Sequence, residues 1–572
     1  MFSIYFRGLG VNCLLPCMVT KNSSNNMAAE VKLHRIVYTL SALVLGRSLR
    51  RFCFPLLSVD LLVLLEQYLR DFLSSTGLLV AASEPKDSGQ TGPGVADDTT
   101  RQQGDLGNNT GLQDVVFIIQ SQKYSYHADK AHQLRENIRQ QAQDIQQEPP
   151  TVVVLHEEWK GRGAWTIFPF LPKISQTFGQ RAAWVFFCED DTAVKLLPLL
   201  HVLRKYDAKK ELFLGRALVD QEATIIHHFA FHQNPGSFSY PDFSAGWALS
   251  APLLNSLAKR WSEESHQGEF TIDLKHEIAM YIYNSGKGVR LTDVPQFCAG
   301  PQNDKDKCVT AFPTELPRCG DPVSEEAVFF AVKTCEKYHK DRVPVVKKTW
   351  GKQARHITYY SDKEDSTIPT VTTGVPNTER GHCGKAYAII KQFDTKEDLK
   401  KMDWLVIADD DTLLSVPRLL RVLSCYDPST PIFLGERYGY GLTRGEDSGY
   451  AYITGGGGMV FSRAGVRKLL SSSCGCPKDD SPDDMILGMC SEMTGVHLVH
   501  SQLFHQARPA DYSKGYLSHQ PPVSFHKHWN TDPYKVYNKY LLTDREKNKH
   551  TELCRKLQYK TEEIFTYFNV LI

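Results

Sequence analysis

Two segments of the chain share one pattern, in which a short apolar run ends directly in carboxylates and a threonine. They read Trp184-Val-Phe-Phe-Cys-Glu-Asp-Asp-Thr192 and Trp404-Leu-Val-Ile-Ala-Asp-Asp-Asp-Thr412. An apolar run of this length is typical of a strand that is buried on both faces. In open α/β sheets, ligands bind beyond the carboxyl ends of such strands. The pattern therefore predicts two buried strands, each with acidic side chains at a ligand-binding end.

These segments belong to a longer internal repeat. Corresponding positions keep a nearly constant offset of 220 or 212 residues: Trp184 and Trp404, Phe213 and Phe433, Val116 and Val328, Gly246 and Gly458. Such self-similarity indicates two tandem copies of one α/β unit. Each copy is long enough to bury a core of its own.

The second copy alternates predicted strands and helices. We expect a strand at Val328–Val332, a helix near Val345–Trp350, a strand at Ile357–Asp362 and a helix over Ala386–Phe393, before the acidic strand. Such βα units build a parallel sheet. The predicted fold class is α/β with two tandem domains. The expected segments are 1–112 (targeting segment and flexible linker), 113–300 (first copy), 301–325 (cysteine-containing connector), 326–540 (second copy) and 541–572 (charged, helix-prone tail).

The first 112 residues have a different composition. Apolar stretches at Ile36–Gly46 and Phe52–Leu65, with arginines between them, favour a secretory signal or an N-terminal membrane anchor. Asp60 interrupts any clean membrane span of about 20 residues. Glycosylation sequons begin at Asn22 and Asn108.

Charge and cysteine content narrow the function classes. The net charge is only +1, so no strong field recruits nucleic acid or acidic lipid. The chain has 14 cysteines, several of them clustered near the connector and late in the second copy. Disulfides in an oxidising compartment explain them best, although the pairing is not readable from sequence. The alternative is scattered, buried free thiols.

The acidic end of the second copy's strand is a candidate metal site. Asp409 and Asp411 are two residues apart, so both carboxylates can bind one hard divalent cation. The alternative is a solvated acidic turn that caps the next helix. Neither copy has EF-hand spacing, which argues against a calcium-binding protein.

Three further motifs follow in the second copy. The run Gly455–Gly458 suits backbone that passes close to a ligand, the alternative being a flexible loop. Pro482 suits a helix start, which places Asp483 and Asp484 at a helix N-terminus, either as caps or with one as a general base. A histidine of Ser524-Phe-His-Lys-His528, His526 or His528, is either a distant metal ligand or a structural residue.

With these motifs, residues 112–540 resemble the fringe-like β-1,3-glycosyltransferases. The resemblance rests on Asp409–Thr412, Gly455–Gly458, Pro482–Asp484 and Phe525-His526. It implies two Rossmann-like, nucleotide-sugar-binding domains of the GT-A type, with an inverting, metal-dependent mechanism. The tandem layout, with the segments Phe433–Gly441 and Leu503–Arg508, resembles one member of the family in particular. That resemblance implies transfer of glucose from UDP-glucose to the 3-hydroxyl of O-linked fucose on thrombospondin type 1 repeats.

The resemblance also implies roles for individual residues. Asp484 is the expected general base. The expected metal ligands, for Mn²⁺ or another divalent cation, are Asp409, Asp411 and His526. The donor nucleotide sugar is expected to contact Lys333, Asp362, Lys385, Asp409, Asp410, Gly456 and Gly457.

The first copy departs from the family pattern. Glu189 replaces the first aspartate, Ala245-Gly246-Trp247 stands where the glycine run should be, and His276-Glu277 replaces the two later aspartates. We expect Trp247 to fill the space that glycine leaves open for a ligand. The first copy is therefore predicted to be degenerate and not catalytic.

Partners and location follow from the resemblance as well. The expected partners are a UDP-sugar and O-fucosylated thrombospondin type 1 repeat proteins, and the expected location is the lumen or membrane of the endoplasmic reticulum. No retrieval signal is visible at Asn569–Ile572. Alternatives are a related transferase that uses UDP-GlcNAc or UDP-galactose, and a non-catalytic lumenal sugar-binding protein.

Overall fold

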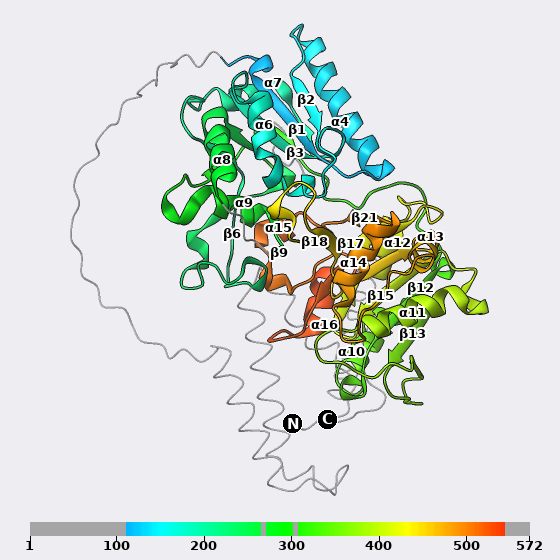
Figure 1. The fold of residues 1–572 in the computed structure, drawn as a ribbon. Coiled ribbons are helices and arrows are strands. Elements are labelled where there is room, and N and C mark those ends of the chain that lie inside the picture. Colours follow the sequence, from blue (N-terminus) through cyan, green and yellow to red (C-terminus); the bar gives the residue numbers. More distant parts are fainter. Residues whose placement is uncertain (1–109, 265–269, 301–306, 544–572) are drawn as a thin grey trace, which may run out of the picture. The chain divides into compact units, whose positions relative to one another are not determined.

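The computed structural model describes residues 110–264, 270–300 and 307–543. In this part of the chain, two α/β units follow each other, each built around one central sheet (Figure 1). The targeting segment, both sequons and the tail beyond residue 543 lie outside the described residues. None of the helices in the described ranges is both long and apolar enough to cross a lipid bilayer.

The first sheet has six strands in the order β10-β5-β8-β3-β1-β2. Their bounds are β1 (Val115–Gln120), β2 (Thr151–Val154), β3 (Trp184–Glu189), β5 (Phe213–Gly215), β8 (Trp247–Ser250) and β10 (Thr292–Asp293). The central pairs β1–β2 and β1–β3 are parallel. The predicted acidic strand of the first copy is β3, and Phe186 and Phe187 within it are fully buried.

The second sheet has seven strands in the order β14-β13-β12-β15-β20-β17-β21. Their bounds are β12 (Val328–Lys333), β13 (His356–Ser361), β14 (Thr370–Thr372), β15 (Trp404–Asp409), β17 (Ile432–Gly435), β20 (Met459–Ser462) and β21 (His497–His500). The acidic strand β15 lies at the centre, parallel to β12. The predicted α/β class with tandem parallel-strand units is confirmed.

Each sheet also contains an antiparallel strand that the sequence pattern did not predict. β8 pairs antiparallel with β3, and β20 pairs antiparallel with β15. The registers match, because Trp184 lies opposite Ser250 and Trp404 opposite Ser462. No helical crossover precedes these two strands, so each enters its sheet from the opposite end.

This register corrects the expectation for Trp247. Trp247 is the first residue of β8, as Met459 is of β20, so it matches a strand residue and not a glycine. Its ring stacks on Phe187 at 4.1 Å and packs on Phe243 at 5.2 Å. Trp247 therefore fills the hydrophobic core of the first copy and does not block a ligand space.

Helices cover both sheets. In the first unit they are α4 (Ser125–Asp144), α5 (Leu155–Glu158), α6 (Leu171–Phe178), α7 (Leu196–Leu203), α8 (Ala251–Glu263) and α9 (Leu274–Tyr283). In the second unit they are α10 (Val343–Lys348), α11 (Cys383–Thr395), α12 (Val416–Leu423), α13 (Arg463–Leu470), α14 (Asp483–Thr494), α15 (Lys514–Ser518) and α16 (Pro533–Val536). α10 and α11 lie where the sequence predicted helices.

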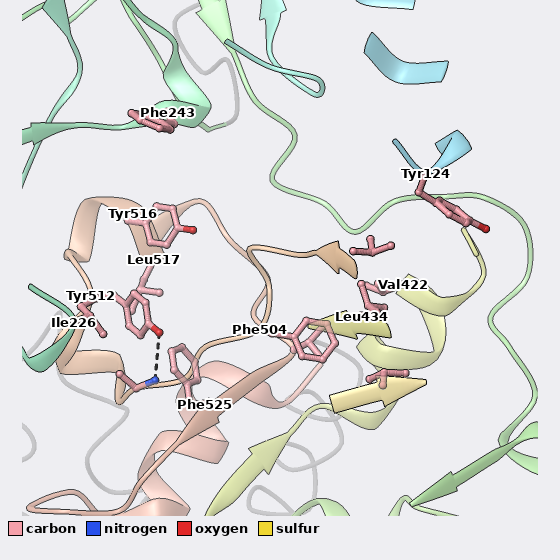
Figure 2. Packing of buried hydrophobic residues seen from close by; sticks show 14 of the residues in the cluster. Tyr124, Ile226, Phe243, Val422, Leu434, Phe504, Tyr512, Tyr516, Leu517 and Phe525 are labelled. Carbon is pink, nitrogen blue, oxygen red and sulfur yellow. Dashed lines mark hydrogen bonds between the residues drawn. The ribbon is translucent and has the colours of Figure 1, made fainter. Parts of the chain in front are cut away.

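The two copies share backbone and side-chain contacts. Strand β9 (Phe270–Thr271) of the first copy pairs with β18 (Arg437–Tyr440) of the second, and β18 pairs with β19 (Tyr450–Ile453). One apolar cluster also contains residues of both copies. Figure 2 shows part of it, with Ile226 and Phe243 of the first copy and Tyr512 and Tyr516 of the second. The first copy therefore supports the second through shared sheet and core.

Disulfides hold the connector and the second copy. The pairs are Cys298–Cys308, Cys319–Cys425, Cys383–Cys476 and Cys474–Cys490. The prediction of disulfides is confirmed. Two cysteines of the described residues, Cys188 and Cys335, are buried free thiols.

Candidate functional site

The carboxyl end of β15 gathers the acidic residues that the sequence singled out. Asp409 is the last residue of β15, and Asp411 precedes the short strand β16 (Thr412–Leu414). β16 pairs antiparallel with β22 (Ser524–His526), which places His526 directly opposite Thr412. Nε2 of His526 then lies 3.1 Å from Asp411 and 3.8 Å from Asp409.

This group fits a divalent cation. Asp409, Asp411 and His526 each offer one ligand atom, and these atoms lie within 4.8 Å of one another. Two carboxylates and one imidazole suit Mn²⁺ and similar ions. His526, and not His528, belongs to the group. The three residues predicted as metal ligands are thus brought together by the fold.

Arg342 and Thr334 hold the two later aspartates. The guanidinium of Arg342 contacts Asp410 at 3.1 Å and Asp411 at 2.9 Å, and Thr334 donates to Asp410 at 2.7 Å. Burial, together with the charge of Asp411, raises the pKa of Asp410 to about 6. Burial also opposes ionisation of Asp411, but His526 and Arg342 outweigh it and hold the pKa of Asp411 well below its usual range. Asp411 therefore stays ionised, as a metal ligand must.

Lys333 joins the acidic strand to helix α14. Its ammonium lies 3.0 Å from Asp409 and also contacts Asp483. Lys333 is buried at the end of β12, so the carboxylates on both sides compensate its charge. Lys333 thus fixes Asp409 relative to the start of α14.

The glycine run passes between the metal group and Asp484. A Cβ at Gly456 would lie 2.3 Å from Nδ1 of His526, so only glycine fits there. The neighbouring Gly455 N–H points to the carboxylate of Asp484 at 3.4 Å. Gly457 donates to Gln506 at 2.9 Å, and Gly458 has φ of 95°. The run is therefore backbone in close contact, as expected, and not a free loop.

Asp483 and Asp484 open α14, and Pro482 is its N-cap residue. Pro482 thus lies one position before the first turn in which it was expected. Asp484 is half-buried, and its partial loss of solvent, together with the charge of Asp483, raises its pKa to about 6. A carboxylate with such a pKa is still ionised at neutral pH and accepts a proton more readily than an exposed aspartate.

The remaining donor-site candidates lie beyond β12 and β13. Lys385, on α11, donates to the backbone oxygen of Thr334 at 2.6 Å. Asp362 follows β13 and accepts from the N–H of Glu336 at 3.0 Å. The charges of Lys385 and Asp362 interact. Lys333, Asp362 and Lys385 therefore share the edge of the sheet at which Asp409 and Asp410 lie.

Among the residues of the first copy that the structure describes, no equivalent metal group lies at the end of β3. Lys130 binds Asp191 at 2.5 Å, and His127 binds Asp190 at 3.0 Å. Strand β4 (Ala193–Val194) pairs with β11 (Thr310–Ala311) as β16 does with β22. When the pairing of β4 with β11 is continued by one residue, Phe312 stands in the position that His526 has in the second copy. Phenylalanine offers no ligand atom.

A separate group in the first copy, Asp220, His227 and His276, has metal-like spacing. Both ring nitrogens of His227 are already hydrogen-bonded, to Asp220 at 2.7 Å and to Asp273 at 3.1 Å. We therefore assign this group to the buried polar core.

His276 and Glu277 are the third and fourth residues of α9, whereas Asp483 and Asp484 are the first two of α14.

Sequence reasoning missed Arg342, Thr334 and Gln506. One signal for the first two was available: both follow β12, the neighbour of β15 in the sheet. Because the carboxyl ends of parallel strands meet at one edge, polar residues after β12 were candidates. No local pattern indicated Gln506.

The family match, like the structure, divides the chain into two copies. The sequence matches the Fringe-like family over residues 118–299 and 323–547. It is 57% identical over 435 residues to a β-1,3-glucosyltransferase of Mus musculus, covering 76% of this chain and 88% of that protein. It is 56% identical over 440 residues to a β-1,3-glucosyltransferase of Homo sapiens, covering 77% and 87%. A Fringe glycosyltransferase of Drosophila melanogaster is 28% identical over 295 residues, covering 47% and 62%.

The chain belongs to the Fringe-like family. The predicted enzyme class, a β-1,3-glycosyltransferase, is confirmed by these relatives.

Proposed function

We propose that this protein transfers glucose from UDP-glucose to the 3-hydroxyl of O-linked fucose on thrombospondin type 1 repeats, as a protein O-fucose β-1,3-glucosyltransferase. The reaction is metal-dependent and inverts the anomeric configuration. The catalytic copy is the second one, and the first copy is not catalytic. The sequence similarity to mouse and human β-1,3-glucosyltransferases supports the glucosyl donor.

One observation carries the assignment of the site. Consecutive glycines contact both halves of it, because Gly455 lies against Asp484 and Gly456 lies against His526. Asp484 and the metal group therefore border the same stretch of backbone. A proton acceptor beside a diphosphate-binding cation is the arrangement that a direct glycosyl transfer needs.

In this proposal, Asp409, Asp411 and His526 would hold a divalent cation beside the donor's diphosphate. When bound, the cation supplies positive charge that stabilises the UDP leaving group. Arg342 keeps Asp410 and Asp411 oriented. In the same proposal, Lys385 and Asp362 contact the nucleotide, and Gly456 and Gly457 let the backbone approach the sugar.

Asp484 is the general base. It removes the proton from the acceptor's 3-hydroxyl as that oxygen attacks the anomeric carbon. Attack comes from the face opposite UDP, so an α-linked donor gives a β-linked product. Lys333 pairs with Asp483 and so holds the first turn of α14, and Asp484 with it, in place. A single displacement of this kind requires no covalent nucleophile.

We further propose that the reaction takes place in the lumen of the endoplasmic reticulum. The four disulfides support an oxidising compartment of the secretory pathway. The acceptor is then a folded, fucosylated repeat of a secreted or cell-surface protein.

The direct test is an incubation of the full chain with a fucosylated thrombospondin repeat, Mn²⁺ and a panel of UDP-sugars, with the product read by mass shift. We expect one added hexose with UDP-glucose, and none after EDTA treatment. Addition of N-acetylhexosamine from UDP-GlcNAc, or preference for UDP-galactose, would contradict the assigned donor. No transfer and no UDP release with any donor would favour a sugar-binding protein instead.

A further inference from the structure

The backbone of Gln506 contacts His526, one of the three proposed metal ligands. Nδ1 of the His526 ring lies 3.0 Å from the carbonyl oxygen of Gln506. The backbone N–H of His526 donates to the next carbonyl, that of Ala507, at 3.3 Å. Because a carbonyl oxygen only accepts hydrogen bonds, Nδ1 carries the proton. In the neutral ring the lone pair is then on Nε2, the nitrogen that faces Asp409 and Asp411.

The side chain of Gln506 reaches the glycine run. Its Oε1 accepts a hydrogen bond from the N–H of Gly457 at 2.9 Å. Gly457 is buried, so its N–H needs an acceptor from the protein. The preceding residue, Gly456, lies against the His526 ring, since a Cβ there would be 2.3 Å from Nδ1. Gln506 therefore acts on His526 in two ways, through its carbonyl and through the glycine run.

Glu436, which follows β17, holds Gln506 in place. The carboxyl group of Glu436 accepts hydrogen bonds from the N–H of Gln506 and from the Tyr512 hydroxyl, the latter at 3.3 Å. The backbone carbonyl of Glu436 accepts from the N–H of Thr454 at 2.9 Å. Thr454 is the residue before the glycine run. Glu436 thus joins the start of the glycine run to Gln506.

A second glutamine of the same loop, Gln502, makes different contacts. Both glutamines are half-buried. Oε1 of Gln502 accepts hydrogen bonds from Ser244 at 3.4 Å and from Gln520 at 3.3 Å. In the described part of the chain, Gln502 forms no hydrogen bond with the glycine run or with His526. It is therefore a matched control for Gln506.

We propose that Gln506 is a positioning residue of the metal site. Its carbonyl fixes the orientation of the His526 ring, and its side chain fixes the glycine run against that ring. Groups that hold a metal-binding histidine in this way determine how well it binds the metal. The inference rests on the proposed function, in which His526 binds the divalent cation. Gln506 acts through His526 and is not itself a ligand.

The test is the Mn²⁺ affinity of the full chain with saturating UDP, measured by electron paramagnetic resonance of free Mn²⁺. Gln506→Met removes the acceptor oxygen and keeps the length of the side chain. Gln506→Asn is a second variant without the contact, because its amide is one carbon shorter. Gln506→Glu keeps an acceptor oxygen at the original length. Gln502→Met makes the same change at the control position.

We expect Gln506→Met and Gln506→Asn to weaken Mn²⁺ binding by about 10–100-fold. Gln506→Glu should bind Mn²⁺ at least as tightly as the wild type, and Gln502→Met should stay within about threefold. Amide hydrogen exchange of metal-free protein, read by mass spectrometry, supplies a readout without metal. The Gly457 N–H should exchange faster in Gln506→Met than in the wild type or in Gln506→Glu, because only the first lacks the acceptor.

Wild-type Mn²⁺ affinity in Gln506→Met or Gln506→Asn would overturn the proposal. So would an equal loss in Gln502→Met, or a Gln506→Glu variant as weak as Gln506→Met. Unchanged exchange of the Gly457 N–H in Gln506→Met would also contradict it. Failure of the proposed function gives a different result: Mn²⁺ binding without hexose transfer would overturn that function alone, whereas a wild-type chain that binds no Mn²⁺ would overturn both.

Discussion

Nε2 of His526 lies 3.1 Å from the carboxylate of Asp411, and a two-stranded antiparallel ladder holds the two residues there. Backbone pairing thus places His526, a candidate metal ligand from the end of the second copy, beside the central strand of its sheet. The first copy keeps the ladder, but the corresponding step leads to Phe312. The proposed difference between a metal-binding second copy and a silent first copy therefore depends on a few side chains and not on the fold.

Replacing the proposed base should remove transfer and spare donor binding. We expect Asp484→Asn to lower kcat by about 10²–10⁴-fold, because amide nitrogen and oxygen do not accept the proton. UDP affinity, measured by calorimetry with Mn²⁺, should stay within about threefold of wild type, since Asp484 is not in the metal group. Asp480→Asn is the control, as Asp480 pairs only loosely with Arg380 at 3.8 Å. Near wild-type transfer by Asp484→Asn would show that the base lies elsewhere.

The pH dependence of transfer follows from the same carboxyl. Burial and the charge of Asp483 raise the pKa of Asp484 to about 6. The base is active only when ionised, so kcat/KM should fall as pH drops through about 6 and level off above about 7. The check is a kcat/KM profile from pH 5 to pH 8 with saturating Mn²⁺. A flat profile over this range would exclude a base with the raised pKa of Asp484.

A methyl group at Gly456 should displace His526. The added Cβ would lie 2.3 Å from Nδ1 of His526, whereas a Cβ at Gly455 would have its nearest neighbour at 4.0 Å. We therefore expect Gly456→Ala to weaken Mn²⁺ binding by about 10–100-fold, as loss of ligand positioning does. Gly455→Ala, in the same run, should change Mn²⁺ binding much less. Equal Mn²⁺ affinities for the two variants would show that metal binding does not require glycine at position 456.

The disulfide between the connector and the second copy should stabilise the molecule. Cys319–Cys425 spans 106 residues, whereas Cys298–Cys308 spans only 10. Because closing a longer loop removes more entropy from the unfolded chain, paired Cys→Ser changes at Cys319 and Cys425 should cost about 2–4 kcal/mol. Urea unfolding followed by circular dichroism measures this loss. The same changes at Cys298 and Cys308 should cost less, and the reverse order would contradict the entropic argument.

Much of the fold was predictable because local sequence patterns determine it. The apolar run before Asp409 predicts a central strand, and the constant offset between Trp184 and Trp404 predicts the duplication. The antiparallel strand β20 was not predicted, since direction within a sheet depends on how distant segments connect. Trp247 was misjudged for the same reason, because only the register shows that it matches Met459.

The candidate site, like the fold, was predictable only in part. Asp409, Asp411, Asp484 and His526 belong to recognisable motifs, and the fold brings them around the glycine run. The contacts of Lys333 with Asp409 and Asp483 join three distant segments. Arg437 and Trp165 come from different copies. No local pattern encodes such contacts, so they are visible only in the structure.

The central claim is that only the second copy binds a catalytic cation, and the count of Mn²⁺ ions per chain tests it most directly. Calorimetric titration in the presence of UDP should give one Mn²⁺ for the wild type and one for Asp191→Asn, but none for Asp411→Asn. Two Mn²⁺ ions per wild-type chain, or a site that survives Asp411→Asn and disappears with Asp191→Asn, would contradict the account.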